Sequence, residues 1–327
     1  MCIKKRNSLY IIGNGFDIAH GIDTKYWNFR VFLEDNYLDF LLEFEKLYNI
    51  FPLDNTEYGY SEEAQERWNK NVDNELWSEF EKTVGEPDAS SMLNYSECTV
   101  DGLDLESGLI GIKDTMDEYW RQEYGYIKKL QEYTKEWIEQ VSLEGVLPRK
   151  KSIKNNQKDY FFNFNYTGIL EQVYNVGNVF HIHGCVANEM ASSPIIGHCN
   201  KEMIDYHYKL SKEADENFDE GGYSIHNAIA EYLEACYKDT KYLIWINDDY
   251  FNKLKTVDNV IVIGWSAGDV DIPYLVKIKE SIREDAKWTV YYYDEKAERN
   301  LKAAFEKTGI INNFNAEFLD SKRFWDM

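Results

Sequence analysis

The segment Ser8–Asp17 reads SLYIIGNGFD and decides how the chain begins to fold. An apolar run that ends directly at a glycine is typical of a buried strand followed by a turn. Gly13 and Gly15 permit positive φ values and let the backbone approach a ligand closely. A helix that starts after them would present free amides and its positive dipole end to a phosphate. The segment therefore predicts a strand, turn and helix of the nucleotide-binding type.

The turn does not complete the dinucleotide-binding pattern G-x-G-x-x-G. The last position of that pattern is Ile18, and the next glycine is Gly21. A tight strand-to-helix turn that binds no ligand is the alternative interpretation. The turn taken alone leaves both interpretations open.

Strand candidates alternate with helical stretches in the second half of the chain. They are the short apolar runs Tyr160–Phe164, Val179–Ile182, Pro194–Ile196, Val260–Ile263 and Trp288–Tyr293. Strands separated by helices indicate a parallel sheet that is covered on both faces. We therefore expect an α/β fold whose sheet core comprises residues 1–34 and 151–327, with a helical insertion at about 201–240.

Residues 35–150 are expected to form a large helical insertion subdomain beside this sheet. Apolar residues recur at helical spacing from Thr115 to Val141, which predicts one long amphipathic helix. Glycine, aspartate and serine in residues 99–111 predict a loop.

The composition restricts the classes of partner. A formal net charge of −22 and a pI of about 4.7 argue against a surface that attracts nucleic acid. Small anionic ligands remain compatible, because backbone amides can bind them locally. The five cysteines are odd in number and scattered, which suits a reducing compartment. No segment has the length and apolarity of a membrane span. We expect a cytoplasmic protein that binds neither membranes nor nucleic acid.

The ends of the predicted strands should converge, because ligands of such sheets sit beyond the carboxyl ends of the strands. The segments that follow the strands are polar, rich in glycine and contain half of the six histidines. They are residues 13–15, 163–166, 181–184, 197–198 and 264–266.

Paired asparagines and histidines supply the chemistry at this edge. Alternation along a strand predicts that Asn163 and Asn165 share one side and that His181 and His183 share one face. A buried asparagine needs specific partners, although one of the two could simply cap the helix that begins near Gly168. A histidine at a strand end before glycine is well placed for acid–base work.

Two further interpretations concern metal and carboxylates. A metal site would add Cys185, His198 and Cys199 to the histidines, but the spacing matches no metal motif, so we expect no bound metal. Two carboxylates follow the apolar run Val260–Ile263. Asp269 is suited to cap the next helix, and Asp271 could bind ligand hydroxyls.

Several of these blocks, in order, resemble the signature of the AbiH family of phage abortive-infection proteins. The matching blocks span most of the chain, and the first of them is quite specific to the family. They are Ile11–Ile22, Phe164–Glu171, His181–Gly184 and Gly264–Ser266, the last followed by Asp269 and Asp271.

The same series is similar, more distantly, to the sirtuin-like NAD-consuming fold. There a GAGxS turn is followed by G-I-P, T-x-N, H-G and G-x-S blocks. The resemblance implies a Rossmann-like parallel sheet with NAD as substrate or ligand, Asn165 as the catalytic asparagine and His183 as the catalytic histidine. With the residues beside the matched positions, the expected NAD-binding set is Gly13, Asn14, Gly15, Phe16, Asp17, Gly264, Ser266 and Asp271.

The chain departs from the sirtuin pattern at several positions. Asp17 stands where sirtuins usually carry serine, Asp23 where the proline of G-I-P stands, and Thr167 replaces the aspartate common after the asparagine. The four-cysteine zinc module that normally follows H-G is missing. The resemblance therefore implies a sirtuin-like NAD hydrolase of phage defence rather than a protein deacetylase.

Cleavage of the nicotinamide–ribose bond has an oxocarbenium-like transition state, which needs positioning and electrostatic support. On this hypothesis His183 is the general base, Asn165 orients the attacking water, and residues 13–15 hold the pyrophosphate.

Two other functions stay open. The departures at Asp17 and Thr167 motivate a non-catalytic nucleotide sensor or interaction module. A nuclease that holds a metal with Asp17, Asp269 and Asp271 is conceivable, but the acidic chain lacks the cationic surface such enzymes use. A phage component as trigger and assembly into a homo-oligomer are compatible with the sequence, which specifies neither.

Overall fold

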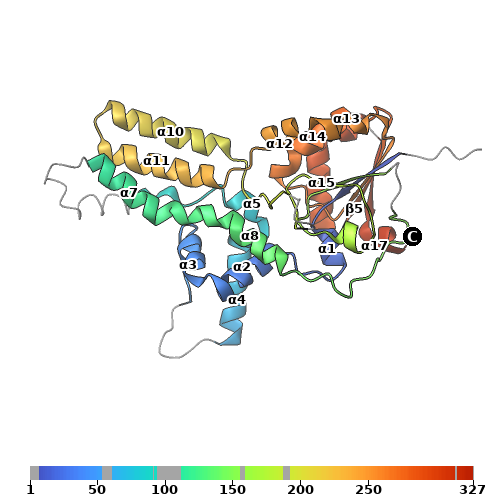
Figure 1. Cartoon of the computed structure of the whole chain (residues 1–327), viewed down its shortest axis with the longest axis horizontal. Coiled ribbons are helices and arrows are strands. Elements are labelled where there is room, and N and C mark those ends of the chain that lie inside the picture. The colour runs from blue at the N-terminus through green and yellow to red at the C-terminus, as the bar shows by residue number, and fades with distance from the viewer. Residues whose placement is uncertain are drawn as a thin grey trace, which may run out of the picture. The chain divides into compact units, whose positions relative to one another are not determined.

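The computed structural model describes residues 7–53, 61–90, 92–93, 112–154, 159–186, 192–313 and 315–326. The protein is a mixed α/β chain that divides into two compact units (Figure 1). The sheet unit comprises residues 1–25, 134–195 and 239–327, and the helical unit comprises residues 26–133 and 196–238. No helix among the residues described is both long and apolar enough to cross a lipid bilayer.

The sheet unit is built on six parallel strands in the order β3-β2-β1-β4-β5-β6, as a parallel sheet was predicted. In chain order the strands are β1 (Ser8–Ile12), β2 (Tyr160–Asn163), β3 (Val179–His181), β4 (Asn259–Ile263), β5 (Lys287–Tyr292) and β6 (Asn315–Asp320). β1 lies at the centre, with Ile12 level with Asn163 of β2 and Ile263 of β4. The ends of these three strands therefore meet at one place.

Both faces of the sheet are buried, because successive side chains of a strand point to opposite faces. Leu9 and Ile11 of β1 join one core cluster, and Ile12 joins the other. The first cluster includes residues of α12 (Thr240–Ile246), α13 (Asp248–Lys253), η4 (Leu254–Thr256), α14 (Ile272–Ser281) and α15 (Glu295–Lys307). The second includes residues of α1 (Gly15–Ala19), α9 (Ile169–Gln172) and α17 (Ser321–Asp326). Two short helices, η5 (Asp269–Asp271) and α16 (Ile310–Asn313), complete this unit.

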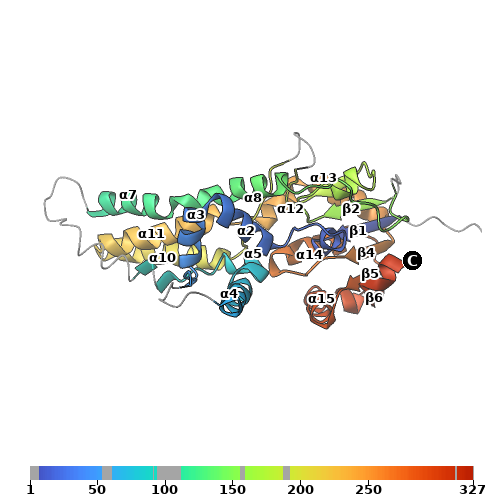
Figure 2. The same ribbon diagram turned by 90° about the horizontal axis from the view of Figure 1, so that it is seen from below.

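The helical unit packs around aromatic side chains. Its elements are α2 (Tyr26–Asn36), α3 (Leu38–Lys46), α4 (Glu62–Glu75), η1 (Trp77–Glu79), α5 (Phe80–Thr83), α7 (Ile112–Tyr124), η3 (Gly125–Lys129), α10 (Lys201–Glu216) and α11 (Glu220–Ala235). α10 and α11 form an antiparallel hairpin, and α7 lies along α11 (Figures 1 and 2). Arg30 and Glu45 form a buried ion pair of 2.7 Å, and the indole of Trp77 donates to the same carboxylate, so neither charge is left unpaired in the core.

Two strand predictions need correction. Pro194–Ile196 forms no strand: proline has no amide hydrogen to donate to a sheet, and the amide of Ile195 donates to the carbonyl of His183 at 2.8 Å. The sixth strand is instead β6, which the sequence did not predict. Its residues NAEFLD include no β-branched side chain and form neither an apolar run nor a strict alternation, so they lack the signal of a strand.

The predicted long helix Thr115–Val141 is also wrong in one respect. α7 ends at Tyr124, the tighter turn η3 follows from Gly125, and α8 (Leu130–Glu139) completes the stretch. Glycine is a poor former of helix interiors, which accounts for the interruption at Gly125. The loop predicted for residues 99–111 lies outside the described residues.

Candidate active site at the carboxyl edge of the sheet

The turns that follow β1 and β4 cross each other in contact at the carboxyl edge of the sheet. The amide of Gly13 donates to the carbonyl of Ile263 at 3.1 Å, and the amide of Gly15 donates to the carbonyl of Gly264 at 2.7 Å. The amide of Phe16 donates to the carbonyl of Gly13 at 2.9 Å. The amides that the sequence offered to a phosphate are therefore used within the protein in this conformation.

The glycines are required by this crossing of two backbones. A Cβ atom on Gly13 would lie 2.5 Å from the Cα of Trp265, and one on Gly15 would lie 2.8 Å from the Cα of Gly264. Gly264 has a φ of +70°, and a Cβ there would lie 2.2 Å from the amide nitrogen of Phe16. The close approach that the sequence predicted toward a ligand is made here between two turns.

The side chain of Asn14 also holds the first turn in place. Its amide donates to the carbonyl of Thr24 at 2.6 Å, and its oxygen accepts from the hydroxyl of Thr24. Both ends of the Asn14 side chain are thus engaged by Thr24, which lies beyond α1. That Gly13, Asn14, Gly15 and Phe16 bind a nucleotide stays a prediction.

A buried polar cluster lies beneath the crossing. The amide nitrogen of Asn165 donates to a carboxylate oxygen of Asp17 at 2.7 Å and to the carbonyl of Gly13 at 3.1 Å. The hydroxyl of Thr167 donates to the other carboxylate oxygen of Asp17, which is 0% exposed. Burial raises the pKa of Asp17 to about 7, although the hydrogen bonds from Thr167 and Asn165 oppose that rise.

The hydrogen bonds of Asn165 fix the orientation of its amide group. Both amide protons are donated inward, so the side-chain oxygen must point the other way. Within the described part of the chain, that oxygen accepts no hydrogen bond. It is therefore suited to accept one from a water or a ligand hydroxyl.

His181 is held as a cation in the same cluster. Its Nδ1 lies 2.8 Å from the carbonyl oxygen of Asn165, and its Nε2 lies 2.8 Å from a carboxylate oxygen of Glu171. Because both neighbours are acceptors, both ring nitrogens carry protons. Burial alone would lower the pKa of His181, but hydrogen bonds with Cys185 and Glu171, together with their charges, outweigh it and raise the pKa to about 10. His181 therefore does not suit proton shuttling near neutral pH.

His183 has a different environment. It is 3% exposed, and its ring lies against Phe164 and Tyr274, with ring centroids 5.5 and 5.3 Å away. Its Nε2 lies 3.9 Å from a carboxylate oxygen of Asp271. The other oxygen of Asp271 accepts a 2.9 Å hydrogen bond from the indole of Trp265. A carboxylate fixed by an indole and facing an imidazole is the arrangement of an acid–base pair.

The prediction that His181 and His183 share one face is wrong. β3 ends at His181 and the chain turns at once, with Gly184 at a φ of +76°, so strand alternation does not extend to His183. His181 contacts Glu171 of α9, on the face of the second core cluster, whereas His183 contacts Tyr274 of the first. The two histidines therefore belong to separate parts of the site.

The remaining predicted residues, Ser266 and Asp269, are exposed and lie outside the buried cluster. Ser266 is exposed in the turn after β4, beside Gly264. Asp269 does not cap the following helix, since η5 is capped by Gly268; it is exposed and pairs with Lys307 at 3.3 Å. Asp17, Asp269 and Asp271 thus have three different sets of partners rather than one shared centre.

Among the described residues, no three histidine, cysteine, aspartate or glutamate side chains are arranged to hold a metal ion. His198 lies in the helical unit, where its Nε2 meets the carbonyl of Leu233 at 2.9 Å and its Nδ1 accepts from the amide of Asn200. Its two ring nitrogens therefore serve the packing of that unit.

Sequence reasoning missed three partners in the site. Glu171 and Tyr274 lie on helices, where no spacing rule links them to a histidine. Glu171 and Trp265 both lie in segments that match the family signature, but only the hydrogen bonds to His181 and Asp271 reveal their roles. The available signal for Trp265 was a bulky aromatic residue in a turn, between Gly264 and Ser266.

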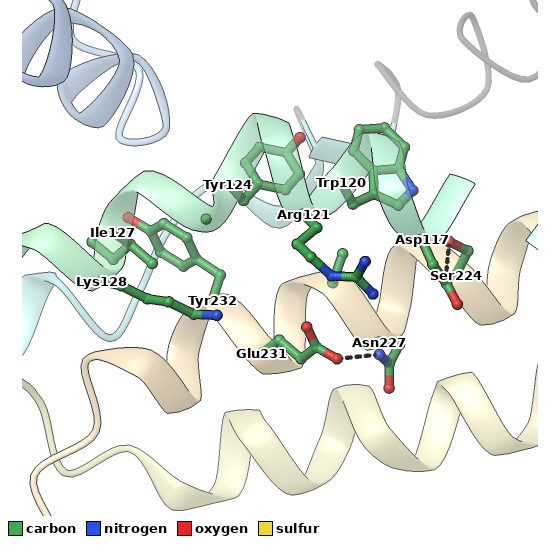
Figure 3. Close-up of a pocket in the computed structure, with 12 residues that line it drawn as sticks. Asp117, Trp120, Arg121, Tyr124, Ile127, Lys128, Ser224, Asn227, Glu231 and Tyr232 are labelled. Atoms are coloured by element: carbon green, nitrogen blue, oxygen red, sulfur yellow. Dashed lines mark hydrogen bonds between the residues drawn. The ribbon is translucent and has the colours of Figure 1, made fainter. Parts of the chain in front are cut away.

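A separate cavity of about 60 Å³ lies in the helical unit between α7, η3 and α11 (Figure 3). The hydroxyl of Ser224 donates to Asp117 at 2.6 Å at one end, and the amide of Asn227 donates to Glu231 at 2.7 Å along its floor. None of the predicted site residues lines it. Its volume is far below that of cavities that hold nucleotide-sized ligands.

The fold and the site together define a parallel α/β protein with a polar site at the carboxyl ends of its central strands. The family model described as bacteriophage abortive infection AbiH matches residues 9–292, which include every residue of this site. The chain belongs to the AbiH family, a family of bacteriophage abortive infection. No curated protein and no solved structure matches the chain significantly.

Proposed function

We propose that this AbiH protein acts in phage defence by hydrolysing the nicotinamide–ribose bond of NAD at the carboxyl edge of its sheet. The strand order β3-β2-β1-β4-β5-β6 is that of Rossmann-like dinucleotide-binding folds. In such sheets the ligand lies where the strand order reverses, which is here between β1 and β4. The sirtuin-like pattern of the sequence supports NAD as the ligand of that crevice.

The observation that carries the proposal is the arrangement of Asn165 and His183. Asn165 presents a side-chain oxygen whose direction is fixed by two inward hydrogen bonds. The Nε2 of His183 faces a carboxylate oxygen of Asp271 at 3.9 Å, whereas His181 lies between two acceptors at hydrogen-bond distance. Hydrolysis needs little more: a base, an oriented water and support for a cationic ribose.

The reaction balances with these groups. Water adds to the ribose C1′ carbon as the bond to the nicotinamide nitrogen breaks, and neutral nicotinamide leaves. Asn165 accepts a hydrogen bond from the water, and His183 takes its proton. Asp271, 3.9 Å from His183, stabilises the imidazolium that results. Ser266, Gly264 and the turn residues Gly13, Asn14 and Gly15 would border the proposed NAD site. The side chains of Phe16 and Asp17, which the sequence analysis also expected to bind NAD, are fully buried and could serve it only from behind.

The test is turnover of NAD by the purified protein, followed by chromatography of nicotinamide and ADP-ribose. We expect His183→Ala and Asn165→Ala each to lower the rate by about 100-fold or more, the usual worth of a general base or a fixed polar group. Asp269→Asn is the control, because this carboxylate is exposed and pairs with Lys307 of α15, outside the proposed site. No turnover by the wild type with phage lysate added, or an unchanged rate in His183→Ala, would overturn the proposal.

A non-catalytic nucleotide sensor is the second candidate, favoured by one specific observation. His183 is almost fully buried, and the amides of the glycine turn are engaged by the protein. Such a closed site could bind without turning over. Calorimetry with NAD and with ADP-ribose separates the two functions: binding without product formation supports the sensor.

A further inference from the structure

The two positions at which the chain departs from the sirtuin-like pattern contact each other. Asp17 follows β1, Thr167 follows β2, and the Thr167 hydroxyl donates to the Asp17 carboxylate. The pattern has a hydroxyl on the first turn and a carboxylate on the second, whereas this chain has the carboxylate first and the hydroxyl second. Both groups are therefore present, exchanged between the two turns.

We propose that Asp17 and Thr167 are a reciprocal exchange, and that the buried carboxylate of Asp17 is the positioning residue for Asn165. This inference rests on the proposed NAD hydrolysis. On this account the departures do not mark a weakened site. They preserve a carboxylate–hydroxyl pair beneath the asparagine.

The hydrogen bonds explain how Asp17 would position Asn165. An asparagine amide can turn over and interchange its oxygen and nitrogen at little steric cost. Here one amide proton is taken by Asp17 at 2.7 Å and the other by the carbonyl of Gly13 at 3.1 Å. The backbone amide of Asn165 also donates to the side chain of Asn163 at 3.1 Å. Removing the carboxylate releases the amide, which could then present a donor where the water needs an acceptor.

The charge of Asp17 adds to this geometric effect. The groups that face Asp17 are Thr167 and Asn165 from the segment after β2, the cation of His181 from β3 and the carboxylate of Glu171 from α9. His181 favours the ionised form of Asp17, and Glu171 opposes it. An anion below the site stabilises a cationic ribose in the transition state. Because the pKa of Asp17 is raised to about 7, the carboxylate gains this charge as the pH rises through neutrality.

The test is a double-mutant cycle with Asp17→Ser, Thr167→Asp and the double variant that carries both. We expect Asp17→Ser to lower kcat for NAD about tenfold or more with KM changed only a few-fold, and the double variant to regain most of that loss. Asp17→Asn keeps the size of the side chain without its charge, so the rise of kcat with pH near 7 should disappear. Asp269→Ser, at an exposed carboxylate, should change neither.

The outcomes distinguish the inference from the proposed function. Thr167→Asp alone buries two carboxylates together, so if it does not fold, comparison of Asp17→Ser with the double variant carries the test. Thermal melts confirm that the compared variants are folded. If the wild type turns over NAD, two results overturn the exchange. One is a double variant whose kcat is no higher than that of Asp17→Ser, and the other is an Asp17→Ser variant whose kcat equals that of the wild type. Absence of wild-type turnover overturns the proposed function, and the positioning role with it.

Discussion

Gly264 and Gly21 have similar backbone angles but different surroundings. Their φ values are +70° and +76°, yet a Cβ on Gly264 meets backbone at 2.2 Å, and one on Gly21 meets nothing within 4 Å. We expect Gly21→Ala to cost about 1–2 kcal/mol through its left-handed backbone alone. Gly264→Ala should cost about 3 kcal/mol or more, because the backbone of α1 must also move. Urea unfolding measures both; equal losses would show that the crossing of the turns is not tight.

His181 should make stability depend on alkaline pH. Its pKa is raised from 6.5 in the unfolded chain to about 10 in the folded one, so its contribution is complete below about pH 6.5 and is lost as pH rises through about 10. We expect the difference in unfolding free energy between wild type and His181→Asn to shrink by on the order of 2 kcal/mol over that range, since Glu171 is partly exposed. A difference that stays constant with pH would contradict the cationic assignment.

At the scale of elements, the sequence predicted those that carry strong local signals. β1, β2, β3, β4 and β5 each lie on a predicted apolar run, and their parallel arrangement follows from the helices between them. β6 has no such run, and Pro194–Ile196 has the apolar side chains of a strand without its hydrogen bonds. Whether a segment joins a sheet depends on which other strand it pairs with, and the local sequence of the segment does not show that.

The candidate site, like the strands, could be predicted from the sequence only where the local pattern was strong. The location of Asn165 and His183 at the carboxyl edge could be predicted, because each follows a strand that ends there. The contact between Asp17 and Thr167 could not, because it joins residues 150 positions apart through side chains of ordinary type. The environments of His181 and His183 depend on where β3 stops, and strand ends are the least certain part of any prediction.

The break between α7 and α8 gives a prediction at this scale. Gly125 does not have a positive φ, and a Cβ there would meet nothing within 4 Å. We therefore expect Gly125→Ala to stabilise the protein by about 0.5–1 kcal/mol through the lower entropy of the unfolded chain. Gly145→Ala is the matched control: it has equally open space but a φ of +77°, so it should destabilise. Thermal or urea unfolding compares the two, and a loss of stability in Gly125→Ala would mean that the turn needs its glycine.

For the molecule as a whole, family membership makes defence against phage the relevant readout. Phage should form fewer plaques on a lawn of cells that express the wild type than on a lawn of cells without the protein. His183→Ala should restore plaque formation fully, whereas Asp269→Asn should protect as the wild type does. Plaque counts alongside NAD levels in infected cells check this. Protection that persists in a stably expressed His183→Ala variant would assign the defence to another part of the chain.

The family match ends at Tyr292, the last residue of β5. β6, α15, α16 and α17 therefore lie beyond the matched region, although β6 completes the sheet and Phe324 of α17 packs into its core. The part of the sheet unit that the family pattern describes is thus the part that bears the proposed site.

The crossing of the two glycine turns has a consequence for ancestry. Gly13, Gly15 and Gly264 occupy the room that one another's side chains would need, although about 250 positions separate the first from the last. A side chain at any one of them would meet backbone of the other turn, so we expect related proteins to keep the three glycines together. Distant relatives of this protein should therefore be sought with a pattern that contains both glycine turns and allows any length of chain between them.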